Sequence, residues 1–306
     1  MSYVSRYLDG VLIERLNHLQ LSARSVVEGS TIGLHKSPVK GASIEFRQHR
    51  IYVPGDEPRR LDWRVLGRTD RHYIKEYDEE TNLRCVIMLD DSGSMGYGGK
   101  HGTKFEYGAK LVAALSYLML GQTETVGLAL FGKRLNQWLA PHAGTAQLSR
   151  VIELLERATP PSPRADASAA GLVKAGGAMH DVADRLGRRS LVIIISDLFS
   201  PASLLREGLA HLRHDRHEVI ALRVLDADEL EFPFRTWSRF RGLEGEKPRL
   251  CEPALVRKAY LASFNKHREE LEQSCRSLGV EFQSFITQKP LIDALTAFLH
   301  RRAIRK

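Results

Sequence analysis

The 306-residue sequence contains few cysteines, and their scarcity excludes two classes of protein. The three cysteines, Cys85, Cys251 and Cys275, are an odd number at unrelated spacings. They therefore predict neither a disulfide framework nor a zinc site. Cys85 lies within an apolar run and is most simply explained as a small core residue.

Long apolar runs are also missing. No stretch approaches the roughly 20 residues that a membrane-spanning helix requires. The first residues mix charges and lack the pattern of a cleavable leader. We therefore expect a cytoplasmic protein with no segment inserted in a membrane. Apolar residues make up 43% of the chain and charged residues 27%, which is ordinary for a globular protein with a buried core.

Acidic residues are outnumbered by basic ones, 37 against 45, so the formal net charge is +8. Such an excess suits a nucleic-acid ligand, but no RNA- or DNA-reading motif accompanies it. The basic residues are scattered and cluster only near the C-terminus, from His300 to Lys306. A solvated basic tail is the simpler interpretation of that cluster. We expect no nucleic-acid partner.

Recognisable catalytic motifs are absent as well. The sequence has no G-x-x-x-x-G-K-[ST] loop, so it does not predict ATP hydrolysis by that route. It has no G-x-S-x-G nucleophile elbow, and His101, His142 and His180 have no predictable place beside a serine. Because no nucleophile and base are assembled by any pattern, we expect a protein that is not an enzyme.

Alternating strand and helix patterns are present from residue 84 onward. Apolar runs predict strands at 84–90, 125–131, 137–140, 190–195, 217–224 and 280–285. Helical periodicity lies between them, at 103–121, 145–158, 166–186, 201–213, 253–278 and 290–301. This alternation predicts an α/β fold with a doubly wound, mostly parallel, Rossmann-like sheet.

The same strand and helix patterns predict the domain organisation. Residues 84–306 form the predicted main domain, with an irregular, aromatic-rich insertion at 227–253. Residues 1–83 form a predicted N-terminal segment, made of a helix, a linker and strands, that packs on the main domain. Its charged residues between 43 and 80 are interpreted as an ion-pair network around Trp63, either a structural brace or a partner-docking face.

Two buried strands end in carboxylates. The run Val86 to Leu89 leads into Asp90, and the run Leu191 to Ile195 is followed by Ser196 and Asp197. Parallel neighbouring strands place such residues at one edge of the sheet, where open α/β sheets bind their ligands. Ser92 and Ser94 add hydroxyls directly after Asp90. Oxygen donors of this kind suit a hard cation such as Mg²⁺, although the same loop could simply cap the next helix.

The stretch Asp90-Asp91-Ser92-Gly93-Ser94 resembles the D-x-S-x-S signature of von Willebrand factor A domains, and Asp197 lies where that family has a later aspartate. The resemblance implies a metal-ion-dependent adhesion site. In such a site Ser92 and Ser94 would touch the metal directly, Asp90 and Asp197 would act directly or through water, and an acidic residue of a partner would complete the coordination.

The upstream segment resembles a narrower family. The stretches at 45–47, 52–56, 60–63 and 77–80 are similar to the hallmark of the DUF58 family, and the resemblance spans roughly residues 20–300. These are bacterial proteins with a von Willebrand A-like domain, commonly encoded beside MoxR-type AAA+ ATPases. The resemblance therefore implies an adaptor or co-chaperone of such an ATPase.

One residue departs from the pattern that this resemblance implies. A threonine is expected in the loop before the helix at 166, and Ala165 stands there instead. Ser168, Thr159 or a water would have to replace its hydroxyl, and Arg164 could instead repel a cation. Our main hypothesis is a non-catalytic interaction module that binds partners, and Mg²⁺, through Asp90, Ser92, Ser94 and Asp197. The alternative is a metal-dependent hydrolase that uses Asp90 and Asp197.

Overall fold

The computed structural model describes residues 5–17, 19, 44–52, 62–69, 72–79, 83–132, 134–158, 175–187, 189–243 and 248–304. The chain divides into two units, one of residues 1–23 together with 84–306 and one of residues 24–83. The sequence predicted one N-terminal segment over 1–83. In the structure, residues 1–23 instead belong to the unit that contains the main sheet.

The smaller unit contains a two-stranded sheet and a short helix. Strands β1 (Ile44–Ile51) and β2 (Tyr73–Glu79) pair in antiparallel fashion, and α2 (Trp63–Thr69) lies between them in sequence. Asp62 is buried at the start of α2, where its carboxylate accepts a hydrogen bond from the backbone N–H of Val65. Trp63 is 66% exposed, and most charged side chains of the predicted ion-pair network lie outside the described residues, so that network stays a prediction.

The larger unit is built on a six-stranded sheet in the order β12-β9-β8-β3-β6-β7. Only the edge strand β7 is antiparallel to its neighbour, which confirms the predicted doubly wound, mostly parallel α/β fold. The strands are β3 (Arg84–Asp90), β6 (Thr125–Phe131), β7 (Leu135–His142), β8 (Leu191–Ser196), β9 (Glu218–Leu225) and β12 (Glu281–Ile286).

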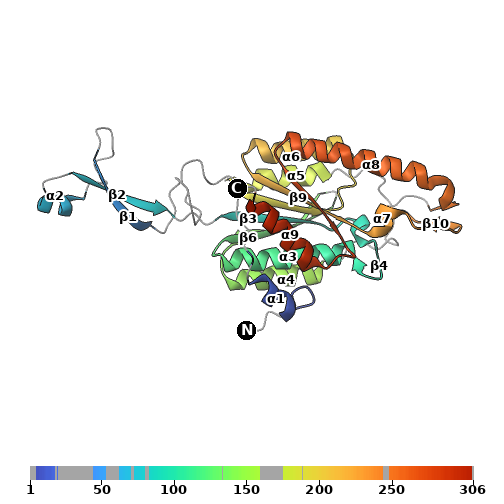
Figure 1. Ribbon diagram of the computed structural model, residues 1–306, viewed down its shortest axis with the longest axis horizontal. Coiled ribbons are helices and arrows are strands. Elements are labelled where there is room, and N and C mark those ends of the chain that lie inside the picture. The colour runs from blue at the N-terminus through green and yellow to red at the C-terminus, as the bar shows by residue number, and fades with distance from the viewer. Residues whose placement is uncertain are drawn as a thin grey trace. The chain divides into compact units, whose positions relative to one another are not determined.

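Helices cover both faces of this sheet (Figure 1). On one face α3 contacts α1, α4 and α9, and on the other α6 contacts α5 and α8. Because both faces are covered, the apolar residues of β3 and β8 are almost completely excluded from solvent. The helices of this unit are α1 (Gly10–Leu16), α3 (Lys104–Gly121), α4 (Thr145–Arg157), α5 (Ala175–Leu186), α6 (Ala202–His214), α7 (Ala227–Glu231), α8 (Pro253–Ser277) and α9 (Leu291–Ile304).

Strand β3 lies at the point where the chain changes direction across the sheet. Its neighbours are β6 on one side and β8 on the other, and both are parallel to it. The loops after β3 and β8 therefore leave the same edge from adjacent strands. A crevice at the carboxyl ends of such strands is the usual ligand site of an open α/β sheet.

Two predicted features differ in the structure. The described part of 227–253 is regular, since it contains α7 and an antiparallel hairpin of β10 (Ser238–Phe240) and β11 (Arg249–Cys251). The C-terminal basic cluster is not simply a solvated tail, because Arg302 is 2% exposed and pairs with Glu218 and Glu281. These ion pairs join α9 to β9 and β12. No helix in the described ranges is long and apolar enough to cross a membrane.

Helix α3 approaches the sheet closely at Gly108. A Cβ atom there would lie 2.8 Å from Leu89 and 3.3 Å from Ile195. We therefore expect Gly108→Ala to lower the free energy of unfolding by about 1–3 kcal/mol, because the helix or these two side chains would have to shift to make room for the added methyl group. Urea denaturation measures this change. Gly121→Ala is the matched control on the same helix: its Cβ meets nothing within 4 Å, so it should stabilise by about 0.5–1 kcal/mol. A Gly108→Ala protein as stable as the control would contradict the close packing.

Candidate functional site

The loop after β3 presents two hydroxyls side by side. It forms a short 3₁₀ turn, η2 (Gly93–Gly96), followed by the two-residue strands β4 (Gly98–Gly99) and β5 (Gly102–Thr103). The Oγ atoms of Ser92 and Ser94 lie 3.1 Å apart, and both side chains are partly buried. This turn places both hydroxyls at the carboxyl edge of the sheet.

Asp90 lies beneath these hydroxyls and is 5% exposed. Its Oδ1 accepts a hydrogen bond from the Ser92 backbone N–H at 2.9 Å, and its Oδ2 accepts one from the Ser196 hydroxyl at 2.5 Å. Burial, together with the negative charge of Asp197, raises the pKa of Asp90 to about 7. The two serine contacts oppose that rise without cancelling it. Asp90 is thus a carboxylate whose charge is poorly compensated by its own surroundings.

Asp197 has a different environment because a buried lysine faces it. The Lys104 ammonium, on the first turn of α3, lies 2.8 Å from Asp197 Oδ2 and 2.6 Å from Glu229 Oε1. Burial alone would lower the pKa of Lys104, but the two carboxylates together raise it above its ordinary value. The side chain of Lys104 is fully buried, so the structure holds a charged lysine between two acids at this edge.

A second buried cation contacts the backbone of Asp197. Arg223 of β9 is fully buried, and its Nε donates a hydrogen bond to the Asp197 backbone oxygen at 2.9 Å. In the part of the chain that the structure describes, neither terminal nitrogen of Arg223 has a hydrogen-bond partner. The guanidinium instead lies over the rings of Phe199 and Phe264, at 5.3 and 5.1 Å from their centroids. Such contacts stabilise a desolvated cation.

Neighbouring loops are tied to the same edge. The amide of Asn136, on β7, donates a hydrogen bond of 2.7 Å to Asp91. The hydroxyl of Tyr97 donates one of 3.0 Å to Asp228 of α7, and burial raises the pKa of this tyrosine. These contacts attach both the β3 loop and α7 to their surroundings, so the hydroxyls and carboxylates are held in place before any ligand binds.

The sequence placed Asp90, Ser92, Ser94 and Asp197 at one site, and the structure brings them to one edge of the sheet. Ala165, where a threonine was expected, lies outside the described residues. His101 and His142 are exposed, and His180 pairs with His211 between α5 and α6. Within the described ranges no histidine forms a hydrogen bond with Ser92 or Ser94.

Several residues of this edge were not anticipated from the sequence: Lys104, Ser196, Phe199, Arg223, Glu229 and His267. Two of them occupy sequence positions that are unusual for a charged residue and could have been noticed. Lys104 lies in the first turn of a helix, where the helix dipole disfavours a cation. Arg223 interrupts an otherwise apolar buried strand, where an unpaired charge is rarely tolerated. His267, which contacts the backbone oxygen of Leu198 at 2.8 Å, follows no such rule.

The donors at this edge can be compared with what a divalent cation needs. Adjacent ligands of an octahedral Mg²⁺ ion, each about 2.1 Å from the metal, lie about 3.0 Å apart. The 3.1 Å between the hydroxyl oxygens of Ser92 and Ser94 fits that separation. The oxygens of Asp90 and Asp197 already accept hydrogen bonds, which suits carboxylates that hold a cation through water. Among the described residues, no three His, Cys, Asp or Glu side chains converge to form a metal site.

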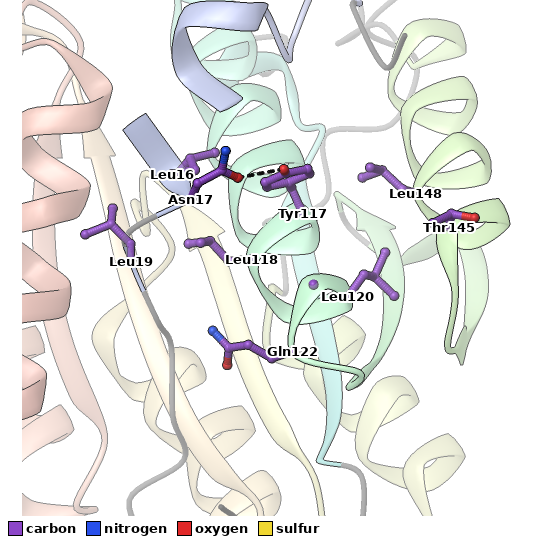
Figure 2. A pocket seen from close by; sticks show the side chains of 10 residues that line it. Leu16, Asn17, Leu19, Tyr117, Leu118, Leu120, Gln122, Thr145 and Leu148 are labelled. Atoms are coloured by element: carbon purple, nitrogen blue, oxygen red, sulfur yellow. Dashed lines mark hydrogen bonds between the residues drawn. The ribbon is translucent and has the colours of Figure 1, made fainter. Parts of the chain in front are cut away.

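A separate cavity of about 650 Å³ lies between α1, α3 and α4 (Figure 2). Leucines from the three helices line it, and the Tyr117 hydroxyl donates a hydrogen bond of 2.8 Å to Asn17 at its margin. The cavity reaches Gln122, just beyond the C-terminal end of α3, whereas Lys104 lies at the other end of that helix. Eighteen helical residues span roughly 27 Å, so this cavity is remote from the Asp90 edge.

The fold and this edge define a doubly wound α/β protein. The loop after β3, the strand at which the chain changes direction across the sheet, carries carboxylate and hydroxyl side chains. A family model described as "Protein of unknown function DUF58" matches residues 48–270, and the chain belongs to this family. Uncharacterised proteins from Mycobacterium bovis and Mycobacterium tuberculosis are each 27% identical to it over 296 residues, which cover 96% of this chain and 90% of the relative.

Solved structures with a similar arrangement include two from Bacteroides. BatB from Bacteroides thetaiotaomicron is 14% identical, with a TM-score of 0.46 over 72% of this chain and 99% of that chain. An aerotolerance-related membrane protein from Bacteroides fragilis is 15% identical, with a TM-score of 0.48 over 74% and 100%. The SpRpn10 VWA domain is 13% identical, with a TM-score of 0.39 over 72% and 95%.

Proposed function

We propose that the chain is a non-catalytic protein-interaction module whose Asp90 edge binds a partner through a divalent cation. The observation that carries this proposal is the pair of hydroxyls on Ser92 and Ser94, held 3.1 Å apart beside the buried carboxylates of Asp90 and Asp197. Ser92 and Ser94 would hold Mg²⁺ directly, and Asp90 and Asp197 would hold it through water. The cation would supply an open position for a carboxylate of the partner.

The proposed partner is a MoxR-type AAA+ ATPase, for which this protein would act as an adaptor or co-chaperone. Support for this partner comes from the family resemblance and from the neighbouring genes that it implies. This is an argument by analogy and not from the chemistry of the site. The fold supports the coarser part of the proposal, because the edge offers an exposed loop on a rigid scaffold.

The test measures Mg²⁺ binding and partner binding with one set of variants. The purified full chain is titrated with Mg²⁺ by calorimetry, and its association with the cognate ATPase is then measured with Mg²⁺ and with EDTA. We expect Ser92→Ala/Ser94→Ala to abolish Mg²⁺ binding and to weaken association by about tenfold or more, since two direct ligands are lost. Ser203→Ala, an exposed serine on α6, is the control.

Three results would count against the proposal. If Mg²⁺ does not bind to the native chain at millimolar concentration, the metal edge is wrong. If the ATPase associates with neither form of the protein, the partner is wrong. If association is the same in EDTA and in Mg²⁺ and is unchanged in the double variant, the edge is not the contact.

A metal-dependent hydrolase is the second candidate, and one observation favours it. The pKa of Asp90, raised to about 7 by burial and by Asp197, suits a general acid or base. Both oxygens of Asp90 already accept hydrogen bonds from buried donors, however, so a substrate would have to compete with these donors for the carboxylate. Phosphoester and ester substrates, with Asp197→Ala as the control, distinguish the two functions: turnover that is lost in the variant would favour the hydrolase.

A further inference from the structure

A group of large apolar side chains is exposed near the β10–β11 hairpin. Trp237, just before β10, is 65% exposed, and Leu250 of β11 is 67% exposed. Leu255, in the first turn of α8, is 77% exposed. Single exposed apolar residues are ordinary, but three within one short segment that also includes a tryptophan indicate a binding surface.

The register of the hairpin shows which way this surface faces. Arg239 pairs with Leu250 across the two strands, so their side chains lie on the same face. Phe240, the next residue, points to the opposite face and packs against Phe232 and Phe234, with ring centroids 5.7 and 5.4 Å apart. Phe240 therefore holds the hairpin to the domain, and the face with Arg239 and Leu250 points outward.

The same segment is strongly basic. Residues 232–258 contain seven Arg or Lys and three Asp or Glu side chains. Four arginines and one lysine of this segment are exposed and, among the residues that the structure describes, none has an acidic side chain within ion-pair distance: Arg235, Arg239, Arg241, Arg249 and Lys258. Arg249 pairs with Phe240 across the hairpin and so lies on the inner face. We call the surface made by the other four cations with Trp237, Leu250 and Leu255 the hairpin surface. Its charge favours an acidic ligand.

An aromatic chain joins the hairpin surface to the Asp90 edge. Phe240 stacks on Phe232, which packs on Tyr260, and Tyr260 packs on Phe264. Phe264 in turn contacts Phe199, two residues beyond Asp197, with ring centroids 6.1 Å apart. The hairpin is thus joined to the Asp90 edge by packed aromatic side chains.

We propose that the hairpin surface binds an acidic segment with apolar side chains that belongs to the protein partner at the Asp90 edge, an inference that rests on the proposed function. Arginine and tryptophan are the residues that contribute most at protein–protein contacts, and the arginine fork matches a carboxylate. Three of the four cations are arginines. An anionic membrane needs only positive charge with inserted apolar groups, and lysine would serve it equally well.

The experiment uses a defined probe because the partner's segment is not identified. The probe is a fluorescein-labelled 16-residue peptide in which glutamates alternate with leucine and phenylalanine, and its control has glutamine at every glutamate. Anisotropy is measured with the full chain, with Arg239→Glu/Arg241→Glu, and with Trp237→Ala. The matched charge control is Arg150→Glu/Arg206→Glu, which changes the net charge equally at exposed sites on α4 and α6.

We expect the glutamate peptide to bind at least about tenfold more tightly than the glutamine peptide. Binding should weaken by about tenfold or more in the Arg239/Arg241 variant and in Trp237→Ala, and by less than about twofold in the matched control, as expected for central contacts of an interface. Circular dichroism checks that each variant is folded. Equal losses in both charge variants, no peptide binding up to about 1 mM, or tighter binding to anionic vesicles or single-stranded DNA would overturn the proposal.

One further variant separates this inference from the proposed function. Ser92→Ala/Ser94→Ala should bind the peptide as the native chain does, because the peptide contact needs no cation. If that variant loses the ATPase while the Arg239/Arg241 variant retains it, the hairpin inference fails and the proposed function stands. If the peptide results hold but Mg²⁺ does not bind, the proposed function fails and the hairpin surface stands as an independent contact.

Discussion

Replacing Lys104 with methionine should lower the free energy of unfolding by about 3–5 kcal/mol, the usual cost of removing one partner from a buried ion pair. The methionine keeps most of the apolar stem of the lysine, so the loss reports the charge and not a cavity. It leaves Asp197 and Glu229 buried without the ammonium that now lies within 2.8 Å of both. Urea denaturation followed by circular dichroism measures the effect.

Helix α3 offers a matched control for this substitution. Lys110 is exposed on the same helix, and Lys110→Met should change stability by no more than about 0.5 kcal/mol. Adding Glu229→Gln to Lys104→Met should recover part of the loss, because one of the two uncompensated carboxylates is then neutral. If Lys104→Met were as stable as Lys110→Met, the buried lysine would not be compensating these acids.

The stability of the protein in EDTA should fall as the pH rises from about 4 to about 7. Asp90 has a pKa of about 7 in the folded chain against an ordinary value of 3.8, so in this range the folded state holds a proton that the unfolded state has lost. Each pH unit then costs at most about 1.4 kcal/mol, which amounts to about 4 kcal/mol over the whole window. Above pH 7 both states are ionised and this dependence ends.

Asp90→Asn should remove this dependence, since the amide does not ionise. Its stability curve in EDTA should be flatter between about pH 4 and pH 7, and Mg²⁺ at pH 8 should stabilise the native chain but not the variant. Asp181→Asn, at an exposed carboxylate on α5, is the control and should follow the native curve. Parallel curves for the native chain and Asp90→Asn would show that Asp90 is ionised throughout.

The sheet could be predicted because its strands are buried on both faces. The runs before Asp90 and before Asp197 are continuous and apolar, which identifies them as strands of a parallel sheet without any knowledge of their neighbours. The helix boundaries followed from periodicity, as for α3 and α4, whose observed ends lie within one residue of the predicted ones. These are local properties of the sequence, since burial of a strand or of one helix face leaves its pattern within a few residues.

The 227–253 segment shows where local patterns fail. Its aromatic residues predicted only an irregular insertion, yet Phe232, Phe234 and Phe240 pack together and hold the hairpin to α8. A three-residue strand is too short to produce a periodic signal. Residues 5–17 pose the same difficulty, because their place beside α3 depends on contacts such as Arg6 with Glu106, 100 residues away.

The edge at Asp90 combines both kinds of information. Sequence alone determined its carboxylates and hydroxyls, because Asp90 and Asp197 end recognisable buried strands and Ser92 and Ser94 follow directly in the chain. Only the tertiary structure decided which charges face them. Lys104 meets Glu229 across 125 residues and Asp197 across 93, and a side chain's partner at such separations depends on strand order and helix packing, which no local pattern of residues encodes.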